Sequence, residues 1–192
     1  MNGYFRRSLR ESESAGIWPT LIPLQIFFAY LALRYSVDSR YSGFLDWVLV
    51  PVHEGGHAVF GLLGEFMGVW GGSLAQWLAP LALSLAFLKR ADLYAASVFF
   101  YYLGLSLNSS YCYMDSAFQM EKYPEMVFVN LGGGEAVHDW QYLFGKFGMY
   151  QSYTAAASLT RGLGLLIMWV ALAGGAWMLW KMATAGREED AS

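Results

Sequence analysis

The stretch FLDWVLVPVHEGGHAVFGLLGEFMGV, residues 44–69, decides how this chain is interpreted. It is apolar except for five ionisable side chains: Asp46, His53, Glu54, His57 and Glu65. An apolar run of about 20 residues is long enough to cross a bilayer as a helix. Ionisable side chains in the middle of such a helix cost about 3 kcal/mol each and usually have a function. The stretch therefore predicts a membrane span that carries a functional site.

The composition of the whole chain supports a membrane protein. Of its 192 residues, 56% are hydrophobic, 18% are aromatic and only 14% are charged, and the mean hydropathy is positive. Ordinary soluble domains contain more charge than this. The apolar residues also form long runs rather than short amphipathic segments. We therefore expect residues 1–192 to form a single membrane-embedded domain.

The apolar runs predict an all-α, polytopic integral membrane helical bundle. We expect five transmembrane helices, with four or six as alternatives, and the candidate spans are residues 17–35, 44–69, 73–88, 92–114 and 161–181. Residues 116–151 are of mixed composition and include Gly132–Gly134, so they predict an extramembrane loop with a short amphipathic helix. In a five-span arrangement, Lys and Arg divide almost evenly between the two sides of the membrane, so the orientation of the chain in the membrane stays open.

Charge and cysteine content exclude some classes of function. The net charge is −3, and the twelve basic residues are scattered along the chain, so no basic face for nucleic acid is expected. The single cysteine, Cys112, cannot form an internal disulfide. The charged segment before residue 17 is similar to the start of a signal peptide, but the apolar run after it is too long. We expect that run to be retained as the first span.

His53 and His57 have the spacing of two metal ligands on one helix. Residues at i and i+4 share a helix face, about 6 Å apart, so both imidazoles can reach one tetrahedral ion. Glu54 lies between them and is free to accept a proton from a water molecule that the ion activates. The run therefore predicts a zinc site with Glu54 as the general base. The alternative is a hydrogen-bonded polar cluster without a metal.

The run His53-Glu54-Gly55-Gly56-His57 resembles the HExxH motif of zincin metallopeptidases. Because it lies in a predicted membrane span, it is most similar to the motif of the intramembrane site-2 protease family. The resemblance implies that both histidines bind zinc, that Glu54 activates water, and that an aspartate on a later span completes the site. That family usually has an Asp-Gly motif, whereas this chain has Asp115 followed by Ser116.

A third protein ligand is needed if one position is to stay open for water. We favour His138, the remaining histidine, with Asp139 orienting an imidazole from the second shell. The alternative for His138 is an ordinary histidine at the start of a helix, with Asp139 as a capping residue. Asp115 is the rival ligand or a substrate contact, or else an interfacial acid. Glu65 is too far along a straight helix, at about 12 Å from His57.

Several functions are compatible with these residues. The leading hypothesis is a zinc-dependent intramembrane metalloprotease, whose partners are membrane lipid and a membrane-protein or peptide substrate. Alternatives are a membrane zinc hydrolase that acts on a lipid or small amide, a metal-binding transporter or sensor, and a structural subunit. We expect the bacterial inner membrane as its location. The substrate, the pathway and the oligomeric state stay open.

Small and polar residues after the motif have two interpretations. Gly71, Gly72 and Ser73 interrupt the apolar pattern and are followed by Gln76 and Pro80. They could present unwound backbone to a peptide substrate. Small residues also permit close helix packing in membranes, and we favour that interpretation.

Overall fold

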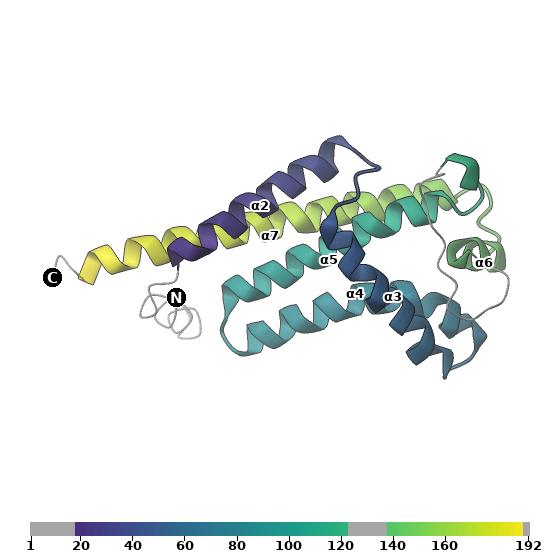
Figure 1. The fold of residues 1–192 in the computed structure, drawn as a ribbon, viewed down its shortest axis with the longest axis horizontal. Helices are drawn as coiled ribbons and strands as arrows, with labels where there is room; N and C mark the ends of the chain where they lie inside the picture. Colours follow the sequence, from purple (N-terminus) through teal and green to yellow (C-terminus); the bar gives the residue numbers. More distant parts are fainter. Residues whose placement is uncertain (1–17, 123–137, 190–192) are drawn as a thin grey trace.

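The structure is a computed structural model that describes residues 18–122 and 138–189. Within these residues it is all-helical and contains no strand, which confirms the all-α part of the predicted fold class. The elements are α2 (Trp18–Val37), α3 (Phe44–Gly61), α4 (Glu65–Lys89), α5 (Leu93–Asp115), the short 3₁₀ helix η1 (Met120–Lys122), α6 (Asp139–Lys146) and α7 (Tyr153–Glu189) (Figure 1).

Three of the described helices are long and apolar enough to cross a membrane. They are α2, α4 and residues 153–184 of α7. This is compatible with insertion into a bilayer, because about 20 apolar residues span the hydrocarbon core. The total of five spans stays a prediction, and residue 17, the expected start of the first span, lies outside the described residues.

α5 lies at the centre of the fold and packs most extensively against α7, which runs antiparallel to it (Figure 1). Glycines allow the two backbones to approach closely. A Cβ atom at Gly104 of α5 would come 2.6 Å from the carbonyl oxygen of Gly164 in α7. Such close packing is typical of membrane helices, where small residues increase van der Waals contact.

The predicted single span of residues 44–69 is two helices, and this corrects the sequence analysis. α3 ends at Gly61 and α4 begins at Glu65, and Gly64 between them has φ +107°, a conformation that residues with side chains rarely adopt. The expected break at Gly71–Ser73 lies inside α4. A Cβ atom at Gly56 of α3 would come 2.2 Å from the carbonyl oxygen of Gly71 in α4. These glycines permit a tight α3–α4 hairpin rather than interrupting a helix.

The predicted loop with a short helix contains η1 and α6. α6 lies at one end of the molecule, beside the ends of α4 and α5 (Figure 1). Its apolar side chains Trp140, Leu143 and Phe144 pack with Met114 of α5 and Tyr153 of α7. Residues 123–137, including Gly132–Gly134, lie outside the described residues. This packing places the first residues of α6 against α3 and α4.

Candidate metal centre

His53 and His57 project from the same face of α3 toward α4. Their ring centroids are 4.6 Å apart and the rings are nearly perpendicular. Gly72 of α4 lies directly against both rings, since a Cβ atom there would come 2.6 Å from Nε2 of His53 and 2.6 Å from Nε2 of His57. The absence of a side chain at Gly72 therefore makes room for the two imidazoles.

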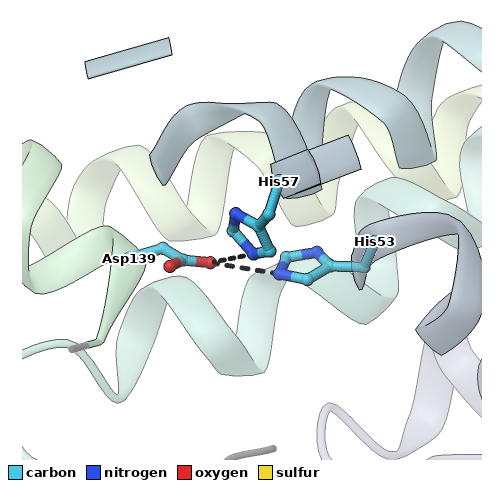
Figure 2. Close-up of side chains that lie close together, drawn as sticks. All are labelled: His53, His57 and Asp139. Carbon is cyan, nitrogen blue, oxygen red and sulfur yellow. Dashed lines mark hydrogen bonds and ion pairs between the residues drawn. The ribbon is translucent and has the colours of Figure 1, made fainter. Parts of the chain in front are cut away.

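Asp139, the first residue of α6, brings a carboxylate to the two imidazoles. Its Oδ2 atom lies 3.1 Å from Nε2 of His53 and 3.3 Å from Nε2 of His57 (Figure 2). The three ligand atoms all lie within 4.8 Å of one another. Two ligands bound at about 2.0–2.1 Å to a tetrahedral zinc ion are about 3.3–3.4 Å apart. The distances from Oδ2 to the two Nε2 atoms are thus close to the distance between two ligands of a tetrahedral zinc ion.

The other ring nitrogen of each histidine faces an acceptor on α4. Nδ1 of His53 lies 2.9 Å from Oε1 of Gln76, and Nδ1 of His57 lies 2.8 Å from the carbonyl oxygen of Gly68. A carbonyl oxygen only accepts, so Nδ1 of His57 carries a hydrogen. Such partners fix the tautomer of metal-binding histidines and direct Nε2 at the ion.

This arrangement requires a positive charge between His57 and Asp139. With hydrogen on Nδ1, the Nε2 atom of a neutral His57 is a bare lone pair facing a carboxylate oxygen. Two acceptors 3.3 Å apart repel each other unless a cation lies between them. Either a proton on His57 or a metal ion satisfies this condition, and the group can chemically hold either.

Asp139 is held as a carboxylate. Burial by itself raises the pKa of Asp139, but the hydrogen bonds with His53 and His57 outweigh burial and lower the pKa to about 2. A carboxylate is the form that binds a metal ion. The side chains are only partly accessible, with exposed fractions of 13% for His53, 28% for His57 and 11% for Asp139. His57 is thus the most solvent-exposed side chain of the group.

Glu54 follows His53 on α3 and is half-buried. Within residues 18–122 and 138–189, no side chain or backbone group forms a hydrogen bond or ion pair with its carboxylate. It is close enough to His57 and to Tyr113 of α5 for its charge to act on both. A carboxylate beside the group, without a competing partner there, can accept a proton from a water molecule.

His138, the predicted third ligand, lies outside this group. It is the N-cap of α6, and its Nδ1 accepts the backbone N–H of Gln141 at 3.4 Å. Its Nε2 lies 2.9 Å from Oγ of Ser116, and its ring stacks on Tyr113. Both ring nitrogens are therefore engaged away from α3. Burial lowers the pKa of His138 to about 4, so the ring is neutral.

Asp139 is in the place that the sequence analysis assigned to His138. His138 precedes α6 with extended backbone and Asp139 is the first residue of the helix, so their side chains point in different directions. His138 is consequently directed at α5 and Asp139 at α3. The rival Asp115 is buried at the end of α5 and is not part of the group, and Glu65 is exposed at the start of α4.

Sequence reasoning did not assign Gln76, Gly72 or Tyr113 to this site. Gln76 and Gly72 belong to the small and polar segment of α4 that we interpreted as a packing surface. The signal for Gln76 was an amide side chain within an apolar segment. The structure buries this side chain, and a buried amide needs a hydrogen-bond partner. For Tyr113, among many tyrosines, the sequence contains no comparable signal.

No protein-family model, curated protein or solved structure matches this chain.

Proposed function

We propose that this chain is a zinc-dependent hydrolase in which His53, His57 and Asp139 hold the ion and Glu54 is the general base. The observation that carries the proposal is the convergence of two Nε2 atoms on one carboxylate oxygen, at 3.1 Å and 3.3 Å. The acceptors behind both imidazoles support it, because they orient Nε2 toward a common point.

The donor set favours zinc over hard cations. Imidazole nitrogen suits zinc and other transition metals, whereas magnesium and calcium prefer oxygen ligands throughout. Three protein ligands also leave one position of a tetrahedral ion open, which is the difference between catalytic and structural zinc sites. A zinc ion held there would supply Lewis acidity and would make water a nucleophile near neutral pH.

The residues of the chain then have distinct tasks. Glu54 accepts a proton from the attacking water and returns it to the leaving nitrogen. A new C–O bond forms as the C–N bond of an amide breaks, so water and the amide yield an acid and an amine. His53, His57 and Asp139 hold their geometry throughout, because Gln76 and Gly68 keep the imidazoles oriented.

We propose a peptide bond within or beside a membrane segment as the substrate. α4 carries Gly68, Gly72 and Gln76 and is one of the helices that are long and apolar enough to cross a bilayer. α3, which carries the histidines, has exposed apolar side chains along its length, among them Phe44, Trp47 and Val59. An apolar segment of another protein can therefore approach the site from lipid.

The first experiment is elemental analysis of detergent-purified protein, with His53→Ala and Glu54→Gln beside the wild type. We expect about one zinc per chain in the wild type and in Glu54→Gln, and none in His53→Ala. Wild-type protein that contains no zinc and takes up none on addition would overturn the proposal. Loss of zinc in Glu54→Gln would overturn the assignment of Glu54 as a base.

The second experiment measures hydrolysis. The protein is reconstituted into phosphatidylcholine vesicles with a single-span peptide that carries a fluorophore and a quencher on opposite sides of its apolar segment. We expect cleavage that is abolished by a zinc chelator and slower by about 100- to 10,000-fold in Glu54→Gln, the usual contribution of general base catalysis. Equal rates in the two proteins would contradict the mechanism.

A further inference from the structure

His138 and Asp139 are neighbours in the chain, but their side chains contact different helices. Nε2 of His138 lies 2.9 Å from Oγ of Ser116, the C-cap residue of α5. The His138 ring also stacks on Tyr113 of α5, with centroids 4.4 Å apart. The Asp139 carboxylate lies instead against the two histidines of α3. The start of α6 therefore joins α5 to the metal group.

The hydrogen positions of the contact between His138 and Ser116 follow from their other partners. The Ser116 hydroxyl has a single hydrogen, which it donates to the carbonyl oxygen of Tyr113 at 2.9 Å. Oγ is left as an acceptor toward His138, so Nε2 carries a hydrogen and donates it. Nδ1 is then the bare nitrogen, and it accepts the backbone N–H of Gln141. The ring thus uses one nitrogen to bind α5 and the other to cap α6.

Both partners of this contact are buried, with exposed fractions of 2% for His138 and 0% for Ser116. A buried N–H without an acceptor is costly, because it has lost its hydrogen bonds to water and gained none in the protein. If Ser116 loses its hydroxyl, the His138 ring has to move to find another acceptor. Asp139 is the next residue, so its carboxylate is displaced by the same movement.

Apolar packing alone does not define the start of α6 in this way. The apolar side chains of α6 pack with α5 and α7, but such contacts are non-directional. Hydrogen bonds depend on both distance and angle. Besides the contact with Ser116, the backbone N–H of Asp139 donates to the Tyr113 hydroxyl at 3.2 Å. Directional contacts with α5 therefore act on both residues at the start of α6.

We propose that Ser116 and His138 are positioning residues, whose hydrogen bond sets the start of α6 and thereby holds the Asp139 carboxylate where it binds the metal ion. This inference rests on the proposed function, since it assumes the ion. Neither residue is a ligand in this arrangement. Their effect on metal binding passes through Asp139.

The test measures the zinc affinity of full-length protein in detergent, by competition with a chelator. Ser116→Ala is made in three backgrounds: wild type, His138→Asn and Asp139→Ala. Asparagine keeps the N-cap of α6, but its side chain is too short to reach Ser116 in place of Nε2. Ser106→Ala is the matched control, because Ser106 is an equally buried serine of α5 whose hydroxyl donates to the Tyr102 carbonyl in its own helix. Helix content is measured by circular dichroism.

We expect Ser116→Ala to lower the zinc affinity of the wild type by about threefold to tenfold, since a direct hydrogen-bond partner of a ligand contributes about 10- to 100-fold and Ser116 acts one contact further from the ion. It should have no effect in His138→Asn or Asp139→Ala, because the hydrogen bond or the ligand is already missing there. Ser106→Ala should keep wild-type affinity. A role in the stability of α5 alone would not depend on the background in this way.

Wild-type affinity in Ser116→Ala, an equal loss in all three backgrounds, or an equal loss in Ser106→Ala would overturn the inference. If Ser116→Ala loses helix content, His138→Asn alone decides, because it removes the same hydrogen bond from the other partner. Wild-type affinity in His138→Asn would then overturn the inference. Wild-type protein that binds no zinc overturns both proposals, whereas a failure of hydrolysis with intact binding affects only the proposed function.

Discussion

Oδ2 of Asp139 lies 3.1 Å from Nε2 of His53, although the two residues are 86 positions apart in the chain. The pair joins α6 to α3, and α4 supports the imidazole from behind through Gln76. Three helices therefore have to pack correctly before the group exists. Metal binding and the packing of α6 are consequently coupled, because a ligand that binds only the folded state stabilises it.

The identity of the third ligand is tested by Asp139→Ala and His138→Asn. We expect Asp139→Ala to lower zinc affinity by more than about 100-fold, since an outer-shell partner alone contributes about 10- to 100-fold. His138→Asn should lose no more than about tenfold, because asparagine is also a good N-cap and keeps the start of α6. Zinc affinity is measured by competition with a chelator.

The outcomes of this comparison are distinct. If His138→Asn loses zinc as completely as Asp139→Ala, His138 is a ligand and the ligand set proposed here is wrong. Asp115→Asn is the control for a buried carboxylate on α5 outside the group, and it should keep wild-type affinity.

Gly72→Ala tests the space that α4 leaves for the imidazoles. The added methyl group would lie 2.6 Å from Nε2 of both histidines, so the rings have to move. We expect zinc affinity to fall by at least about tenfold, comparable to the loss of an outer-shell partner. The matched control is Gly55→Ala, inside the motif itself, where a Cβ atom meets nothing within 4 Å. A loss in Gly55→Ala equal to that in Gly72→Ala would refute this explanation.

Gln76→Leu tests the hydrogen bond that orients His53. The substitution removes the acceptor 2.9 Å from Nδ1 and replaces it with an apolar side chain of similar size. Zinc should bind about 10- to 100-fold more weakly. Gln25→Leu is the control, because Gln25 donates to the Leu172 carbonyl between α2 and α7, away from the site. An unchanged affinity in Gln76→Leu would show that Gln76 does not support the metal site.

Gly104→Ala tests the close approach of α5 and α7. A Cβ atom there would come 2.6 Å from the Gly164 carbonyl oxygen, and backbone cannot yield as a flexible side chain does. We expect the free energy of unfolding to fall by about 1–3 kcal/mol, the usual cost of overpacking. It is measured by sodium dodecyl sulfate titration in mixed micelles. Gly162→Ala, where a Cβ atom meets nothing within 4 Å, should be neutral or stabilising.

The local features of this chain could be predicted from sequence. The histidines lie on one helix face because an i, i+4 spacing does so in any helix, and the long apolar runs of α2, α4 and α7 are membrane-compatible by length and composition alone. The all-helical fold class follows from the same runs. Each of these properties depends only on neighbours along the chain.

The division of residues 44–69 into two helices and the position of Asp139 beside the histidines depended on contacts between distant segments. Residues 44–69 form two helices because Gly64 adopts a positive φ and the glycines of α3 and α4 pack face to face, which apolar periodicity does not distinguish from one long helix. Asp139 rather than His138 reaches the histidines because α6 begins with its first turn directed at α3. Tertiary packing decides that direction, since the apolar side chains of α6 pack with Met114 of α5 and Tyr153 of α7.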